Sequence, residues 1–236
     1  MSLGECLTVA AYLVGAGAFW MAARRRQMAS EGIAYLALAA LVGGVIGAKI
    51  GEWAVANGAA WAAHPFAILE VRGGGRSILG GVLGGWIAVE IAKKRLGIRR
   101  STGDLWALAL PWGEAVGRIG CWFNGCCFGA PWSGPCAVWQ HEAWRFPAQF
   151  LSSACAFAIG CFLWWPRKET LREGQLWHWY LMGWGACRVG IEFVRNHPSY
   201  DGMLSSAQWT ALVILTIGVV LWRRDRERYL NATMPV

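Results

Sequence analysis

Long apolar stretches alternate along the chain with short polar segments that are rich in arginine and lysine. A helix needs roughly 20 apolar residues to cross the hydrocarbon core of a bilayer. The apolar stretches are continuous and lack the strict alternation of barrel strands, so they favour helices. The pattern predicts about seven transmembrane helices in an all-α membrane protein, at approximately residues 3–22, 33–56, 78–92, 104–119, 148–165, 175–194 and 207–222.

Basic residues gather in alternate loops of this seven-helix pattern. The clusters fall within residues 24–26, 93–100, 167–172 and 223–228. Because arginine and lysine accumulate on the cytoplasmic side, we expect the N-terminus outside and the C-terminus inside. The first apolar stretch is followed, not preceded, by its arginines, so we expect a retained span and not a secretory signal. Residues 1–236 are expected to form one transmembrane domain, whose outer loop 120–147 makes a small cap.

Composition supports a membrane location. Apolar residues make up 56% of the chain and charged residues 15%, whereas charged residues make up about 25% of a soluble domain. The 17 tryptophans suit membrane–water interfaces. Because most of the basic residues fall in the inner loops, the net charge of +8 reflects topology and no nucleic-acid partner is expected. We predict a multi-pass integral membrane protein.

A second set of charges lies within the spans or on the outer side, where charges are costly. Two interpretations are open: an outward-facing polar cavity inside the bundle, or structural ion pairs that lock helices together. The basic members of this set are Lys49, Arg72, Arg76, Arg118, Arg145, Arg188 and Arg195, and acidic residues such as Glu114 and Glu192 lie in the same layer.

The segment 103–129 carries the densest pattern. We expect its span to end at Gly117 and Arg118 and to continue as a polar turn that includes Gly120. The planar guanidinium of Arg118 can bind two phosphate oxygens at once. Alternatively, Arg118 binds no ligand, and its long side chain only extends so that the charged group reaches the membrane surface.

The stretch GRIGCWFNGCCFG, residues 117–129, resembles the signature G-R-[IL]-G-N-F-x-N-x-E-x-x-G of bacterial prolipoprotein diacylglyceryl transferases. Five further segments resemble motifs of that family and occur in the same order. They are GAKIGE (47–52), GGGRSILGGVLGG (73–85), RFPAQF (145–150), CRVGIEFVR (187–195) and LSSAQW (204–209).

The resemblance implies a location in the bacterial inner membrane and a membrane-embedded chamber open to lipid and to the outer face. There, a diacylglyceryl group passes from phosphatidylglycerol to a lipobox cysteine, and glycerol phosphate is released without a cofactor. By motif position Arg118 and Arg188 would hold the phosphate, which is an electrostatic role, and Asn124 would orient the headgroup. The other substrate-binding candidates are Arg76, Ser77, Gly117, Gly120, Glu192, Arg195 and Tyr12.

Three positions depart from the family pattern. Leu79 stands where the family has a histidine, Cys121 where it has an asparagine, and Cys126 where it has a glutamate. Leucine cannot accept a proton, so we expect an altered acceptor or altered chemistry. The acceptor is then a lipoprotein cysteine or another nucleophile of the outer face. The alternative function is a lipid-binding or thiol/redox membrane protein that keeps the fold.

Four cysteines fall in the outer segment: Cys121, Cys126, Cys127 and Cys136. One interpretation is a disulfide, with Cys127 and Cys136 as the candidate pair. The other is a catalytic nucleophile at Cys126, whose pKa the nearby Arg118 would lower. No metal site is expected, because the spacing C-x4-C-C-x8-C lacks the paired C-x2-C units of zinc sites.

Overall fold

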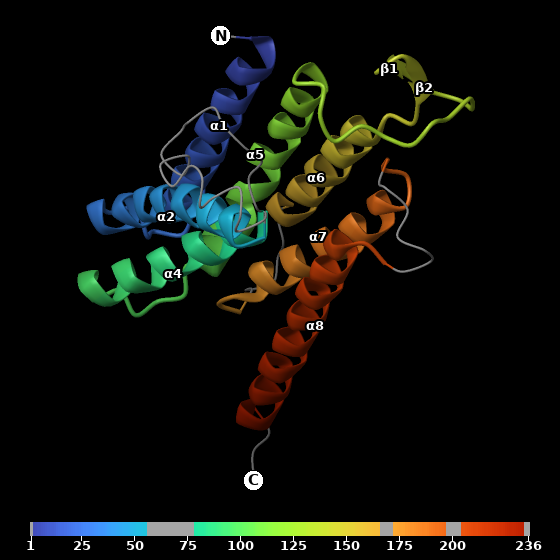
Figure 1. Ribbon diagram of the computed structural model, residues 1–236. Helices are drawn as coiled ribbons and strands as arrows, with labels where there is room; N and C mark the ends of the chain where they lie inside the picture. The colour runs from blue at the N-terminus through green and yellow to red at the C-terminus, as the bar shows by residue number, and fades with distance from the viewer. Residues whose placement is uncertain (1, 56–77, 166–171, 197–203, 234–236) are drawn as a thin grey trace. The chain divides into compact units, whose positions relative to one another are not determined.

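The computed structural model describes residues 2–55, 78–165, 172–196 and 204–233. Over these ranges the chain forms seven helices and one β-hairpin (Figure 1). The elements are α1 (Leu3–Arg25), α2 (Glu31–Val55), α4 (Ile78–Leu96), α5 (Gly103–Phe123), β1 (Val138–Gln140), β2 (Ala143–Arg145), α6 (Ala148–Trp164), α7 (Gln175–Glu192) and α8 (Ser206–Thr233).

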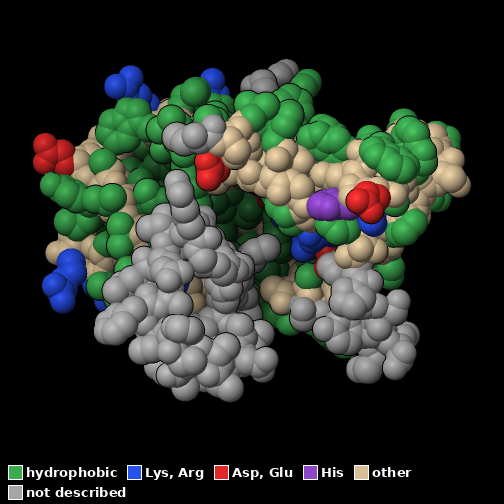
Figure 2. Space-filling view, turned by 45° about the horizontal axis from the view of Figure 1, so that its top comes forward, with side chains coloured by type: hydrophobic (Ala, Val, Ile, Leu, Met, Phe, Trp, Pro, Cys, Tyr) green, Lys and Arg blue, Asp and Glu red, His purple; other side chains and the backbone are tan. Residues whose placement is uncertain are grey.

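The predicted helix positions are confirmed, since each helix begins within two residues of the start expected from the apolar pattern. Two helices are long and apolar enough to cross a membrane, over Leu3–Arg25 and Glu31–Gly51, and the apolar α6 is shorter. Hydrophobic side chains also cover much of the face in Figure 2. That all seven helices cross the bilayer, and in which direction, stays a prediction.

The expected end of the fourth span at Gly117 and Arg118 is wrong. Helix α5 continues without a break to Phe123, and Asn124 caps its C-terminal end. Both glycines of this stretch instead face α1. A Cβ atom at Gly117 would lie 3.6 Å from the Cβ of Ala11, and one at Gly120 would lie 3.3 Å from that of Leu7. Small residues allow two membrane helices to approach closely. These glycines therefore allow α5 to pack against α1, and they do not end the helix.

The chain folds as two compact units, residues 23–100 and residues 1–22 with 101–236. In the first unit α2 packs against α4 through glycines on both helices. A Cβ atom at Gly47 would collide with the carbonyl oxygen of Gly80, and one at Gly84 with that of Gly43. The two backbones are therefore in direct contact, an arrangement typical of small-residue membrane interfaces.

In the second unit α5 packs against α6 and α7, and α7 packs against both α6 and α8. Polar groups join these helices. The Ser153 hydroxyl donates to the Ala115 carbonyl at 2.8 Å, and the Trp164 indole donates to the Leu108 carbonyl at 2.7 Å. The buried carboxylate of Asp104 accepts the backbone N–H groups of Gly174 and Trp177, both at 3.1 Å, and so holds the start of α7.

The loop between α5 and α6, which the sequence predicted as an outer cap, is folded. Its strands pair with Trp139 opposite Trp144, and His141 and Glu142, both with positive φ, form the two-residue turn. The segment after α5 also pairs with the segment after α7, because Gly129 bridges Arg195 and the Ala130 N–H donates to the Val194 carbonyl at 3.0 Å. The cap is thus joined to the helices at both of its ends.

Candidate functional site

A small pocket lies within the second unit, among α5, α6 and α7. Two of the predicted phosphate-binding residues, Arg118 of α5 and Arg188 of α7, line it together. They are 70 positions apart in the sequence, so only the packing of α5 beside α7 brings them to one cavity. The remaining polar or aromatic lining includes Glu114, Ser152, Cys155, Trp184 and Cys187.

Arg118 is held by an acid one turn earlier on α5. Its Nη2 lies 3.1 Å and its Nε 3.4 Å from Glu114 Oε1. The other carboxylate oxygen of Glu114 accepts the indole N–H of Trp184 on α7 at 2.8 Å. Glu114 therefore orients the arginine and ties two helices together. Motif comparison did not single it out, although its spacing of four residues from Arg118 was a usable signal.

Glu192 lies between two arginines near the end of α7. Its Oε2 is 3.1 Å from Arg188 Nη2 and 3.4 Å from Arg195 Nη1, and its Oε1 accepts the Ser205 hydroxyl at 3.3 Å. Only 1% of the Glu192 side chain is exposed. The predicted sharing of one helix face holds for Arg188 and Glu192, whereas α7 ends at Glu192 and Arg195 reaches the same carboxylate from the turn that follows the helix.

Arg188 has one donor to spare. Its Nη1 is buried and has no hydrogen-bond partner among the described residues. A buried, unsatisfied guanidinium N–H costs free energy, and this one belongs to a residue that lines the pocket. An anionic oxygen in the pocket would satisfy it.

Two further candidates lie away from the pocket lining. Asn124, at the end of α5, points toward α1, where a Cβ atom at Gly4 would collide with its side chain. Tyr12 lies on α1 with 52% of its surface exposed. Arg76 and Ser77 fall outside the described residues. Leu79 is the second residue of α4.

Gln149, in the RFPAQF segment, is a residue that sequence reasoning did not name. It is 1% exposed, and its amide nitrogen donates to the Cys126 carbonyl and to Gln140 Oε1, each at 3.0 Å. Arg145 of the same segment donates to the Gln140 carbonyl at 2.9 Å and lies over the Phe128 ring. Gln149 therefore joins the cap to α6, whereas Arg145 joins parts of the cap to one another.

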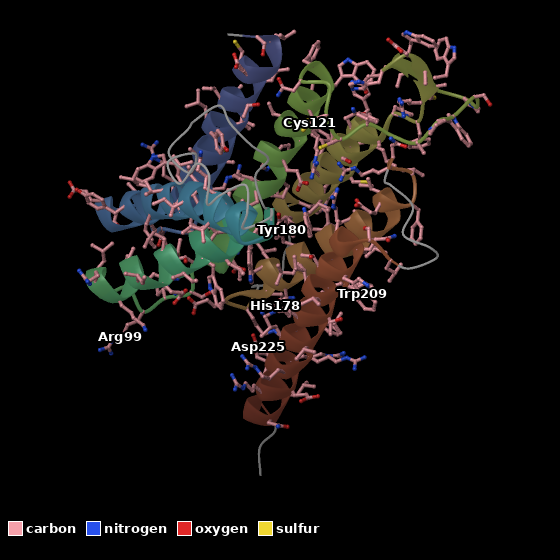
Figure 3. All side chains as sticks on the ribbon, in the orientation of Figure 1. Arg99, Cys121, His178, Tyr180, Trp209 and Asp225 are labelled. Atoms are coloured by element: carbon pink, nitrogen blue, oxygen red, sulfur yellow. The ribbon has the colours of Figure 1, made fainter. Side chains whose placement is uncertain are left out.

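The cysteines after α5 do not pair as expected. All eight cysteines lie in the described ranges and all are free, so the disulfide between Cys127 and Cys136 is not formed. Cys127 instead lies with Cys121 and Cys126, and the three sulfur atoms are all within 4.8 Å of one another. Figure 3 labels Cys121 near the end of α5 that leads into the cap.

The surroundings of the cluster do not favour a thiolate at Cys126, contrary to the expectation from the sequence. Hydrogen bonds with Cys121 and Cys127, together with burial, raise the pKa of Cys126 instead of lowering it. Hydrogen bonds from Cys121 and Cys126 lower the pKa of Cys127, and the positive charges of Arg195 and Arg118 act in the same direction. A nucleophilic role for Cys126 thus lacks the electrostatic support that was expected for it.

Comparison with known proteins agrees with the motifs. The chain matches the family model for prolipoprotein diacylglyceryl transferase over residues 6–224. It is 28% identical over 215 residues to the phosphatidylglycerol–prolipoprotein diacylglyceryl transferase of Clostridium tetani, with 87% of this chain and 85% of the relative covered. The enzymes of that name from Bordetella parapertussis (29% over 232 residues, 89% and 87% covered) and Polynucleobacter asymbioticus (31% over 199 residues, 80% and 76% covered) are similar. The chain belongs to the prolipoprotein diacylglyceryl transferase family.

Proposed function

We propose that this chain moves the diacylglyceryl group of phosphatidylglycerol onto the thiol of a prolipoprotein cysteine. The relatives named above carry this activity in their names. We further propose that the protein spans the bacterial inner membrane several times, that its N-terminus lies outside and its C-terminus inside, and that its pocket opens toward the outer face.

The unpartnered Nη1 of Arg188 is the observation that carries the proposal. A phosphodiester headgroup offers anionic oxygens, and a guanidinium binds such oxygens with short, charge-assisted hydrogen bonds. Arg188 keeps Nη2 on Glu192 while Nη1 remains available to a ligand. The residue is therefore oriented by the protein before the headgroup arrives.

The charges of the network suit an anion. Among the described residues, two acids, Glu114 and Glu192, are in direct contact with the three arginines Arg118, Arg188 and Arg195. The excess positive charge would attract the phospholipid headgroup. It would also stabilise the charge that builds up on the phosphate as it leaves, which is the preorganised electrostatic form of catalysis.

In the reaction, the sulfur of the acceptor thiolate forms a bond with the glycerol carbon that carries the phosphate. The bond between that carbon and the phosphate oxygen breaks, and the electron pair leaves with glycerol phosphate. The thiol must first lose its proton. The family histidine that would be a candidate base is replaced by Leu79, so the proton has to leave by another route.

The experiment uses purified protein in phosphatidylglycerol vesicles labelled in the headgroup, with and without a lipobox peptide. Release of glycerol phosphate and the mass of the peptide are both measured. We expect Arg188→Ala to lower the rate by about a hundredfold or more, because a preorganised donor to the developing charge is lost. Arg188→Lys keeps the charge without the planar fork and should recover part of the rate.

The matched control is Arg228→Ala, which removes an exposed arginine at the far end of α8. It should turn over at the normal rate. Normal turnover by Arg188→Ala would refute the assignment of the phosphate to this pocket. Release of glycerol phosphate without a mass gain on the peptide would keep the donor and reject the prolipoprotein acceptor.

The alternative function, a lipid-binding or thiol/redox protein on the same fold, is favoured by one observation, the three neighbouring cysteine sulfurs. It predicts no release of glycerol phosphate from any vesicle. It also predicts that two of the three thiols cycle between reduced and bridged forms under mild reductant, which thiol trapping with mass detection would record.

A further inference from the structure

The turn that follows α5 brings three cysteines together. Cys121 lies in the last turn of the helix, and the backbone N–H of Cys126 donates to the Cys121 carbonyl at 3.1 Å. Gly125 and Cys127 both adopt positive φ, 64° and 60°, which lets the chain reverse within a few residues. A positive φ is uncommon for a residue with a side chain. With Cys127 in this conformation, its sulfur lies beside those of Cys121 and Cys126.

The spacing of the sulfurs suits a bound metal ion. A Zn–S bond of about 2.3 Å places tetrahedral thiolate ligands about 3.8 Å apart. The three sulfur atoms lie within 4.8 Å of one another before any ion is considered, so a small contraction completes the site. A disulfide would need about 2.0 Å between two sulfurs and would leave the third without a partner.

The surroundings hold the cluster and compensate its charge. Gln149 fixes the Cys126 carbonyl, and the Asn196 N–H donates to the Phe128 carbonyl at 3.2 Å just beyond Cys127. The positive charges of Arg118 and Arg195 both act on Cys127. Three thiolates and one Zn²⁺ carry a net negative charge, which these arginines offset. Contacts of this kind outside the ligand set orient metal ligands and tune the site.

The part of the chain that the structure describes places three protein ligands in this group. Among the described residues, no other histidine, cysteine, aspartate or glutamate offers an atom to this group. Three protein ligands with one open position are the pattern of catalytic zinc sites, whereas structural zinc sites have four. Cys126 is exposed and the other two cysteines are half-buried, so an incoming ligand can reach the cluster.

We propose that Cys121, Cys126 and Cys127 bind one Zn²⁺ as three thiolates, and that the fourth position takes the acceptor thiol. The second part rests on the proposed transferase function. A metal ion deprotonates a coordinating thiol, so the acceptor proton passes to water as the sulfur binds zinc. The zinc-bound sulfur then forms the bond to the glycerol carbon while the carbon–oxygen bond to phosphate breaks. No oxidant or reductant is needed, and zinc does the work of the base that Leu79 cannot perform.

The proposed site departs from the expectation of no metal site, which rested on the sequence separation of the cysteines. The sulfurs meet through the end of a helix and a reversed turn instead of a C-x2-C unit. The two positions at which family residues are replaced by cysteine, Cys121 and Cys126, are both ligands in this proposal.

The first test measures metal directly. The full chain, purified in detergent with reductant after growth with zinc, is analysed by mass spectrometry for zinc and copper. We expect about one zinc per chain, and loss of zinc to background in Cys126→Ser and Cys127→Ser. X-ray absorption should give sulfur neighbours at about 2.3 Å. Cys136→Ser, which removes an exposed cysteine of the same loop outside the cluster, should retain the metal.

Four results would overturn the site: no zinc in the wild-type chain, zinc retained by the two cluster variants, copper(I) in place of zinc, or a disulfide within the cluster. Misfolding of a cluster variant would not decide the matter, so the wild-type chain is also titrated with a chelator. A folded chain that releases one zinc ion supports the site.

The second test separates this inference from the proposed function. Headgroup release with the lipobox peptide is measured before and after chelation, and we expect a loss of about a hundredfold, the scale of general-base catalysis. Activity without any bound zinc would reject the inference and leave the transferase function intact. Bound zinc without activity would keep the metal site and reject the transferase. Bound zinc with activity unchanged by its removal would reject the thiol-activating role.

Discussion

Arg188 and Glu192 form a buried ion pair one turn apart on α7, with 3.1 Å between Nη2 and Oε2. The same carboxylate contacts Arg195, and its other oxygen accepts the Ser205 hydroxyl just before α8. Glu192 thereby holds three groups in place. They are Arg188, which lines the pocket, Arg195, which pairs with the cap, and Ser205, which lies just before α8. Stability and the binding of the headgroup are expected to depend on this one side chain.

Glu192→Gln should destabilise the fold by roughly 3 kcal/mol, because two arginines would be left in partly buried positions without a counter-charge. Thermal unfolding in detergent measures this loss. Glu227→Gln is the control, since Glu227 is an exposed acid on α8. Equal melting temperatures for the two variants would show that the Glu192 charge is dispensable.

Gln149→Leu should loosen the cap, because the Cys126 carbonyl and Gln140 Oε1 both lose a donor. An unsatisfied buried polar group costs about 1–3 kcal/mol. Hydrogen exchange over residues 126–146 should therefore become faster. Trp139→Ala, which removes an exposed side chain of β1, should leave the exchange of residues 126–129 unchanged, and similar protection in both variants would contradict the role given to Gln149.

Gly47→Ala should separate α2 from α4, because the new methyl group would meet the backbone of Gly80 and Gly84, which cannot yield as a side chain can. Overpacking of this kind costs about 1–3 kcal/mol. The matched control is Gly44→Ala, whose methyl group would lie at an ordinary 3.6 Å from the Gly81 carbonyl oxygen. A melting temperature for Gly47→Ala that is no lower than that of the control would show that this contact is not tight.

Labelling with a membrane-impermeant maleimide tests the orientation. In intact cells Cys6, an exposed residue in the first turn of α1, should be modified from the outside. A cysteine placed by Arg228→Cys at the far end of α8 should react only after the membrane is made permeable. Mass analysis of the separate peptides distinguishes the two sites, and the reverse pattern would invert the proposed topology.

The sequence by itself determined where the helices lie. Runs of about 20 apolar residues bounded by basic clusters leave a helix as the simplest way to satisfy backbone hydrogen bonds in lipid, and the observed starts agree within two residues. The order of the motifs determined the family. The spacing of four residues between Arg188 and Glu192 also determined that they share one helix face, whereas Arg195 lies beyond the end of α7.

Only the tertiary structure decided what these helices bring together. The sequence placed a break at Gly117 and Arg118, whereas close packing against α1 uses the glycines and lets α5 continue. The indole of Trp184 on Glu114 and the amide of Gln149 on Cys126 join residues 70 and 23 positions apart. The meeting of Cys127 with Cys121 and Cys126 depends on a reversed turn that no spacing rule contains. These contacts depend on which helix faces meet, and the order of residues along a single helix does not fix that.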